Sequence, residues 1–320
     1  MKNIYIFGSD GQDGSILKTI LKKKGKKLKL FLFSKTSLKI IENNIVSYKY
    51  NFKTKLDYLL LIQKLISEKK PSHIFYFAAV HLSSTESEDS VNNDDMLFTN
   101  YSLIAFIFNQ CQILSIKPKI IYASSSLIFS GTNSYPQNEL TKRVPKCDYS
   151  KQKVLTENLL IKLGQEYDIP VLIPIFYNHE SVKRQNKFFT KKIISFCSRI
   201  ANQLNSDLEE SITLFNPNSI IDMGYAPEYL EMLLELTKLD KFGSFIFSSG
   251  STIKVKEFTD NVLKFYGLSS TLISYKTMKP RFEVDLIGDN QMLIDAVRKK
   301  PSIVGKNLVF KLCNDYEANI

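Results

Sequence analysis

Three side chains in the middle of the chain have the types and the spacing of an acid–base group. Tyr149 and Lys153 lie four residues apart at the start of a long amphipathic segment, so they share one face of a helix. Upstream, the apolar run from Ile120 to Ala123 predicts a strand that ends in a cluster of hydroxyls, with Ser125 in its middle. A lysine beside a phenol lowers the phenol pKa, and a hydroxyl can orient a substrate oxygen, so this set could move a proton.

A glycine turn near the N-terminus could hold the phosphates of a nucleotide. The apolar run from Ile4 to Phe7 stops at Gly8, and Gly11 and Gly14 follow at three-residue intervals before a helix-like segment. A dinucleotide pyrophosphate needs such a turn because backbone without Cβ atoms lets phosphate oxygens approach the N–H groups at a helix N-terminus. Taken alone, the glycine turn could serve only the packing of the strand against the helix. Taken alone, Tyr-x-x-x-Lys could be part of a solvated helix face. Together they resemble the Rossmann turn and the Ser, Tyr and Lys of short-chain dehydrogenases.

The elements that must position these residues alternate along the chain. This rhythm predicts an α/β fold, a Rossmann-type doubly wound parallel sheet with a smaller C-terminal substrate-binding subdomain. We expect a nucleotide domain over 1–177 and mainly the subdomain over 178–320, with segments around 212–250 returning to the sheet edge. The predicted strands are 28–33, 44–50, 73–79, 119–123, 169–176 and 242–250, and the predicted helices are 57–70, 96–114, the helix that begins near Tyr149, and 254–267.

Composition fits one enzyme with a large core. The chain has 320 residues, of which 44% are hydrophobic. No apolar run reaches the roughly 20 residues of a membrane span, and the chain opens on a strand instead of a signal peptide, so we expect a cytoplasmic protein. The four cysteines have no C-x-x-C spacing and the three histidines are dispersed, so we expect reduced thiols and no metal site.

The formal net charge of +11 does not by itself indicate a nucleic-acid partner. The lysines are spread along the chain, as in 22–27 and 141–146, without interleaved aromatic residues or a known nucleic-acid module. Solvated basic faces explain most of the charge, and a basic cleft that attracts a doubly charged sugar nucleotide is the alternative.

Several longer motifs resemble the GDP-mannose 4,6-dehydratase branch of the extended short-chain dehydrogenases. The resemblance runs almost end to end, and GQDGS together with NHES is far more specific than the glycine turn. The matching stretches are GQDGS at 11–15, YSKQK at 149–153, NHES at 178–181, FTKK at 189–192, DMGYA at 222–226, EVDL at 283–286 and GD at 288–289.

The resemblance implies roles for further residues. It implies a nicotinamide cofactor, a nucleotide-sugar substrate, and cofactor phosphates held by Gly8, Gly11, Gln12, Asp13 and Gly14. Asn51 and Phe52 would lie near the adenine, Ala78 and Ala79 would line the nicotinamide side, and His179, Glu180 and Arg184 would close over the cofactor. Asn178 and Lys192 would face the nucleotide sugar.

The cofactor is expected to be NADP(H) and not NAD(H). The second strand ends in LFSKTS, with no Asp or Glu to accept from a ribose 2′-hydroxyl. Lys35 stands where the family places an arginine for the 2′-phosphate. A surface lysine beside the site is the alternative.

One departure from the family bears directly on the reaction. The family's strand-end motif reads S-T-S-E-L-Y-G, and aligning its Tyr with Phe129 puts Ser125 at the Thr and Leu127 at the catalytic Glu. A 4,6-dehydratase removes the C5 proton with that carboxylate, and Leu127 cannot move a proton. Oxidising or reducing C4 needs only Ser125, Tyr149, Lys153 and the nicotinamide. The extra Ser130 permits a shifted alignment, but no nearby shift supplies an acid.

Two further departures concern the substrate and the assembly. The family's phosphate-gripping Arg before DWGYA is Ile221 here, and Lys279-Pro280-Arg281 offers Arg281 as a replacement cation. The family's long loop after the second strand, associated with its tetramer, is cut to roughly 36–44. We therefore expect a homodimer that pairs through the helices at 96–114 and 149–164.

The sequence thus predicts an NADP(H)-dependent oxidoreductase acting at C4 of a nucleotide-activated sugar. Reduction of a 4-keto-6-deoxy sugar, with GDP as the default nucleotide, in surface-polysaccharide synthesis is the favoured reaction. A 4,6-dehydratase with a relocated base, a nucleotide-sugar epimerase and a non-catalytic nucleotide-sugar-binding paralogue stay open as alternatives.

Overall fold

Apolar strands form a mostly parallel sheet at the centre of the molecule. The computed structural model describes residues 2–24, 27–34, 41–42, 44–49, 55–81, 92–202, 211–278 and 285–319. The strand order is β12-β8-β6-β5-β1-β2-β4-β3, and neighbouring strands are parallel except β3 and β4. This sheet confirms the predicted fold class. Its strands are β1 Lys2–Phe7, β2 Leu28–Ser34, β3 Ile41–Glu42, β4 Ile45–Lys49, β5 His73–Tyr76, β6 Lys119–Tyr122, β8 Val171–Phe176 and β12 Gly243–Phe247, and β7 Ser124–Ser125 pairs with β8.

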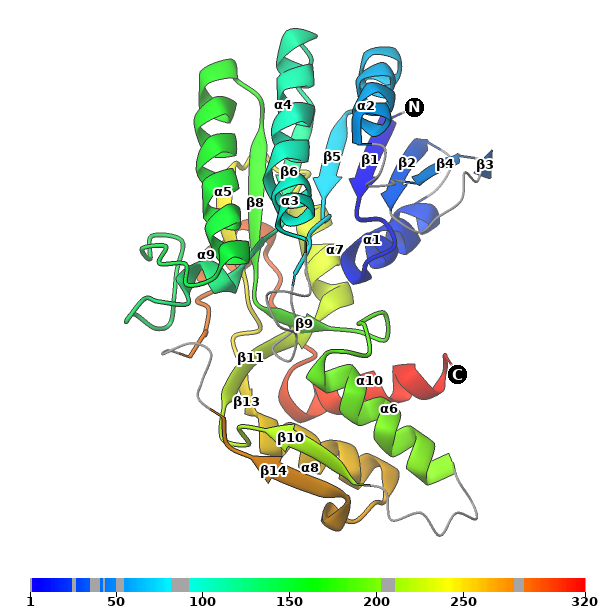
Figure 1. Ribbon diagram of the computed structural model, residues 1–320, viewed down its shortest axis with the longest axis vertical. Coiled ribbons are helices and arrows are strands. Elements are labelled where there is room, and N and C mark those ends of the chain that lie inside the picture. The colour runs from blue at the N-terminus through cyan, green and yellow to red at the C-terminus, as the bar shows by residue number, and fades with distance from the viewer. Residues whose placement is uncertain are drawn as a thin grey trace.

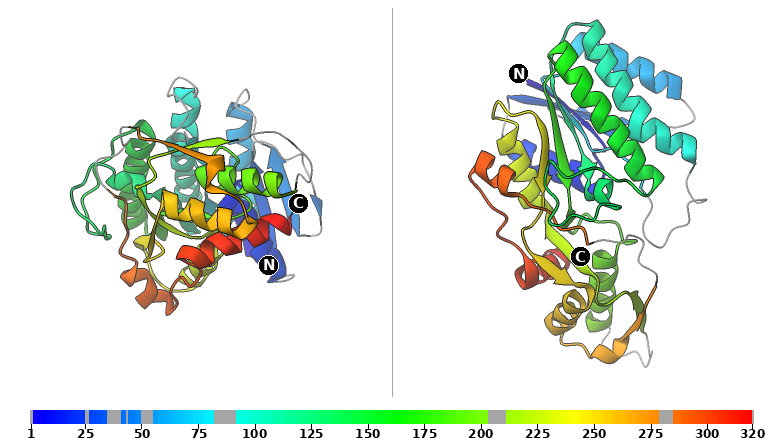
Figure 2. Two further views of the ribbon diagram at one scale, coloured as in Figure 1. Left: turned by 90° about the horizontal axis from the view of Figure 1, so that it is seen from below. Right: turned by 90° about the vertical axis from the view of Figure 1, so that its left-hand side faces the viewer.

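The strands alternate their side chains between two helical layers. Ile6 is level with Phe75 of β5, which is level with Ile121 of β6, and all three lie in the core on one face. Their neighbours Tyr5 and Ile74 lie in the core on the other face. Helices α1 (Gln12–Lys23), α7 (Ala226–Leu236) and α9 (Gln291–Val297) cover the first face, and α2 (Lys55–Lys69), α4 (Leu103–Ile113) and α5 (Asp148–Tyr167) cover the second (Figures 1 and 2).

Two predicted elements differ from the structure near the carboxyl ends of the strands. The helix predicted over 96–114 is α3 (Asn93–Leu97), a π-helical turn (Phe98–Ser102) and then α4, because the side chain of Asn100 bonds the backbone of Val80. The strand predicted over 73–79 ends at Tyr76. Beyond it, the backbone at 77–78 packs so tightly against Gly8 that a Cβ on Gly8 would lie 2.7 Å from the Ala78 nitrogen.

A smaller lobe lies beyond the carboxyl ends of the strands (Figure 1). Its core includes Ile193, Phe258 and Leu308, and is separate from the two layers on the main sheet. Among the segments predicted to return to the main sheet, β12 pairs with β8 at its edge, whereas β10 and β11 pair within the lobe. The lobe contains β9 Asn178–Glu180, β11 Ile220–Tyr225 and β13 Thr252–Lys254 in one sheet, β10 Ile212–Phe215 and β14 Ile273–Lys276 in another, and the helices α6 Phe189–Asn202, α8 Val255–Tyr266 and α10 Gly305–Glu317.

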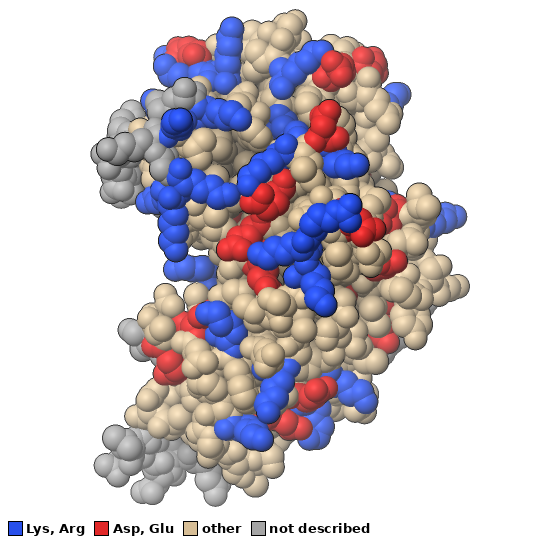
Figure 3. Space-filling view, turned by 180° about the vertical axis from the view of Figure 1, so that it is seen from behind, with Lys and Arg blue, Asp and Glu red and all other residues tan. Residues whose placement is uncertain are grey.

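Charged side chains are mixed over the surface of the molecule. Figure 3 shows Lys and Arg from one end of the rear face to the other, with Asp and Glu between them. Among the described helices, none is both long and apolar enough to span a lipid bilayer. All four cysteines are free thiols.

Candidate active site

The glycine turn joins β1 to α1, and its three glycines have different surroundings. Gly8 has a φ of +79°, which favours glycine. A Cβ on Gly14 would lie 2.3 Å from the Gly8 carbonyl oxygen, so this glycine lets the helix pack on the turn. Gly11 is exposed, and a Cβ there would meet only that oxygen, at 3.3 Å. Helix α1 begins after Gly11 without a side-chain cap, so its N-terminus fits a phosphate approaching the backbone.

Substitutions at Gly11 and Gly14 should separate binding from folding. We expect Gly14→Ala to destabilise the protein by about 1 to 3 kcal/mol, because its Cβ would overlap backbone. Gly11→Ala should change stability by less than about 1 kcal/mol but weaken NADPH binding by roughly tenfold or more, since each tenfold corresponds to about 1.4 kcal/mol. Urea unfolding and fluorescence titration measure the two effects. Unchanged NADPH affinity in Gly11→Ala would show that no phosphate approaches this turn.

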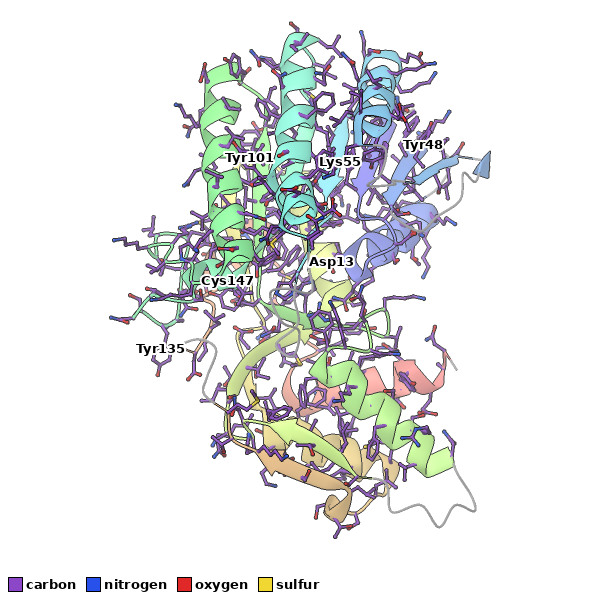
Figure 4. All side chains as sticks on the ribbon, viewed as in Figure 1. Asp13, Tyr48, Lys55, Tyr101, Tyr135 and Cys147 are labelled. Carbon is purple, nitrogen blue, oxygen red and sulfur yellow. The ribbon has the colours of Figure 1, made fainter. Side chains whose placement is uncertain are left out.

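The first turn of α1 is tied to the smaller lobe by residues of the two most specific motifs. The Asp13 Oδ1 and His179 Nε2 atoms are 2.9 Å apart, and the Gln12 amide donates to the His179 carbonyl at 2.9 Å. The Ser181 hydroxyl in turn donates to the side-chain amide oxygen of Gln12 at 2.9 Å. Figure 4 shows Asp13 where α1 faces β9. These bonds fix the turn against β9, so Gln12 and Asp13 have protein partners besides any cofactor.

Asp13 and His179 form a buried charged pair. Burial acts to raise the pKa of Asp13, but the charge of His179 and its hydrogen bond outweigh burial and hold this pKa below its ordinary value. Burial acts to lower the pKa of His179, but Asp13 outweighs it and raises this pKa. The pair therefore favours a carboxylate and an imidazolium at the glycine turn.

Ser125, Tyr149 and Lys153 converge at the carboxyl end of β6. Lys153 is 2% exposed, and its ammonium donates to the Ala123 carbonyl at 2.7 Å. Its Nζ lies 4.6 Å from the centroid of the Tyr122 ring and 5.5 Å from that of Tyr149. Burial raises the pKa of Tyr149, whereas a hydrogen bond with Ser125 lowers it. The structure therefore brings the three predicted catalytic side chains together.

Helix α5 carries Tyr149 and Lys153 to the carboxyl end of the sheet. It packs against the face over β6 and β8 and begins after Cys147, which Figure 4 shows at the end of the sheet that faces the lobe. The α-helical rise places Tyr149 and Lys153 on one side, one turn apart. Ligands of open α/β sheets bind at this carboxyl edge, where the strand order reverses on either side of β1.

Leu127 follows this group in a 3₁₀ turn, Ser126–Phe129. Its N–H donates to the Ser125 hydroxyl at 3.3 Å, and its side chain is half-buried. The turn contains only serine, leucine, isoleucine and phenylalanine side chains. It therefore offers no carboxylate beside Ser125.

Two further residues surround Tyr149, and one of them was not predicted. The His81 ring lies edge-on to the Tyr149 ring, with centroids 4.5 Å apart. The Arg184 guanidinium stacks on Phe188, 3.8 Å from its centroid, and its charge lowers the pKa of Tyr149. The buried Arg184 Nε has no hydrogen-bond partner, although it lies 3.6 Å from Glu180. An anion bound here would satisfy this nitrogen, which fits the predicted role of Arg184 at the cofactor.

Asn100 is a second residue that sequence reasoning missed. It is fully buried in the π-helical turn, where its side chain accepts from the Val80 N–H at 2.9 Å and donates to the Val80 carbonyl at 3.1 Å. Its amide also donates to Gln152 of α5 at 3.0 Å. Asn100 thus fixes the segment after Ala78 and Ala79 against the catalytic helix. A polar residue in an otherwise apolar stretch was the available signal, and π-turns are frequent at functional sites.

The predicted substrate residues lie on the lobe or outside the described residues. Asn178 begins β9 and Lys192 lies on α6, and both are exposed. Glu180 is buried and accepts from Thr190 at 2.5 Å, so this carboxylate has a partner within the lobe. Ile221 packs against the lobe core. The residues outside the described ranges are Lys35, Asn51, Phe52 and Arg281.

The sheet and the glycine turn define the class, a Rossmann-type α/β protein. Within it, the chain belongs to the GDP-mannose 4,6 dehydratase family, whose model matches residues 5–303. A Caenorhabditis elegans relative, GDP-mannose 4,6 dehydratase 2, is 27% identical over 313 residues, which are 94% of this chain and 78% of the relative.

Solved structures share the fold at low sequence identity. The dTDP-glucose 4,6-dehydratase from Bacillus anthracis, in complex with NAD, superposes with a TM-score of 0.82 at 13% identity over 100% of this chain and 97% of that chain. The protein RMD from Pseudomonas aeruginosa, complexed with NADPH, gives 0.78 at 16% identity over 100% of both. The first of these structures contains NAD and the second contains NADPH.

Proposed function

We propose that this protein is an NADP(H)-dependent oxidoreductase that reduces C4 of an NDP-4-keto-6-deoxy sugar, with GDP as the default nucleotide, in surface-polysaccharide synthesis. The family supports a nucleotide-sugar substrate. The observation that carries the proposal is a Ser125–Tyr149–Lys153 group whose neighbouring 3₁₀ turn holds Leu127 and no carboxylate. Such a site can protonate the C4 oxygen, but the turn supplies no base that could remove a proton from carbon.

The roles of the three residues follow from their contacts. The bound nicotinamide would supply hydride to the C4 carbon. Tyr149 donates its proton to the C4 oxygen, so the ketone becomes an alcohol and the phenolate is left beside the Lys153 ammonium. Ser125, whose hydroxyl lowers the pKa of Tyr149, orients the same oxygen. Lys153 stabilises the phenolate and donates to the ribose hydroxyls.

The leading alternative is a 4,6-dehydratase with a relocated base, and His81 favours it. An imidazole is a base at neutral pH, and this ring contacts Tyr149. An epimerase or a non-catalytic binding partner would also consume no NADPH. Oxidation of NADPH, followed by absorbance with candidate 4-keto-6-deoxy sugar nucleotides, therefore tests the proposal against all three.

The nucleotide base can be identified separately by thermal shift. A sugar nucleotide present at 100 times its dissociation constant adds roughly 2.7 kcal/mol to the folded state. Comparing GDP, UDP, CDP and dTDP sugars then identifies the base even if no turnover is observed.

Lys35 is the next residue in the sequence after β2, and we propose that it binds the 2′-phosphate of NADP(H). NADPH should bind more tightly than NADH, and Lys35→Ala should narrow the gap by roughly 1 to 3 kcal/mol, the scale of a charge-assisted hydrogen bond. Titrations of both cofactors measure the gap, with Lys22→Ala on the exposed side of α1 as the matched control. Equal affinities in the wild-type protein would contradict the assignment.

We further propose a homodimer that pairs through α4 and α5. These helices lie side by side on one face of the sheet (Figure 1), and Leu155 of α5 is 50% exposed there. Light scattering after size-exclusion chromatography measures the assembly.

A further inference from the structure

A buried carboxylate lies one helical turn beyond Lys153. Glu157 is 2% exposed, and it accepts a hydrogen bond from the Ser124 hydroxyl. Its other oxygen lies 3.5 Å from the Arg143 Nε. A buried carboxylate is costly without such partners, so this one is held at a defined position behind the catalytic group.

Three consecutive residues at one strand end act on three groups of α5. The Ala123 carbonyl accepts from Lys153, Ser124 donates to Glu157, and the Ser125 hydroxyl lowers the pKa of Tyr149. Residues 124 and 125 form β7, which pairs with β8. This pairing fixes Ser124, the hydrogen-bond donor to Glu157, directly beside the catalytic Ser125.

The charges around Lys153 alternate in sign. Glu157 shares its helix face, because residues four apart are neighbours on a helix. Arg143, from the loop before α5, pairs with Glu157 and donates to the Thr141 carbonyl at 3.1 Å. Tyr122 of β6 and Tyr149 of α5 are the other titratable groups that face the ammonium.

We propose that Glu157 is a positioning residue that, held by Ser124 and Arg143, stabilises the protonated form of Lys153 and sets the upper pH limit of the site. Burial lowers the pKa of Lys153 to about 7 even though the Glu157 carboxylate acts to raise it. Burial holds the pKa of Glu157 above its ordinary value, although Ser124, Arg143 and Lys153 act to lower it. Lys153 is neutral above its pKa. Removal of the Glu157 charge should therefore make Lys153 lose its proton at a lower pH.

The test rests on the proposed cofactor site but needs no sugar substrate. NADPH affinity, measured by fluorescence from pH 5 to 9, should fall as Lys153 loses its proton. In Glu157→Gln this fall should occur about one pH unit lower or more, the scale of a lost neighbouring charge. Turnover of a sugar, once identified, should move in the same way.

Two variants distinguish positioning from a structural role. Glu157→Asp keeps the charge and should restore most of the wild-type profile, and Glu166→Gln, on the exposed side of α5, should leave the profile unchanged. A Glu157→Gln protein that is less stable but has the wild-type pH midpoint would overturn the proposal. If Glu157→Gln does not fold, Ser124→Ala should shift the midpoint in the same direction by less, and an unmoved midpoint there would also overturn it. Absence of NADPH binding in the wild type would instead contradict the proposed function.

Discussion

Replacing Tyr149 by Phe should reduce turnover by a factor on the order of 10² to 10⁴ while NADPH still binds. The phenylalanine ring keeps the edge-on contact with His81, but the proton that neutralises the C4 oxygen is lost. Steady-state rates of NADPH oxidation with the keto sugar measure the effect, and fluorescence titration measures cofactor affinity in the same protein.

Tyr167→Phe is the matched control for this variant. Tyr167 ends the same helix, α5, and is 36% exposed, so losing its hydroxyl should leave turnover unchanged. Near-normal turnover in Tyr149→Phe would place the chemistry elsewhere, and a loss of folding would be visible in its thermal unfolding curve.

The main sheet could be predicted because its signal is local. Strands buried on both faces contain continuous apolar runs, as at 30–33 in β2 and at 171–176 in β8. The Tyr149 and Lys153 pair could be predicted for the same reason, since helical periodicity alone puts them on one face. Ser125 was predicted from the hydroxyl cluster that follows the apolar run 120–123, and it lies in β7 directly after β6.

The remaining site contacts join residues far apart in the chain, so no local pattern reveals them. Asp13 and His179 are 166 residues apart, and the motifs that contain them were recognised by resemblance and not by any physical reason to pair them. Asn100 of the π-helical turn bonds the backbone of Val80, and His81 contacts Tyr149 of α5, which lies far along the chain. Tertiary packing decides such details over local propensity.

The wild-type protein given GDP-mannose should form no 4-keto-6-deoxy product, yet it should oxidise NADPH when given a suitable 4-keto-6-deoxy sugar nucleotide. Elimination requires a base that removes the C5 proton before the C6 hydroxyl leaves. The turn Ser126–Phe129 contains no acidic side chain. The resemblance to the family implies that its carboxylate would stand at Leu127. The reduction needs no carbon base, so the same site can still complete it.

The decisive assay uses the unmodified enzyme in deuterated water, with the product examined by NMR and mass spectrometry. Installing the missing group as Leu127→Glu is a weaker test, because a carboxylate in a half-buried leucine site can be desolvated or misoriented. Deuterium at C5 together with loss of the C6 hydroxyl would show that another residue is the base, and the reductase proposal would be withdrawn in favour of a dehydratase. His81→Asn then identifies that base: it should abolish C5 exchange if the imidazole next to Tyr149 removes the proton, and it should leave exchange intact if it does not.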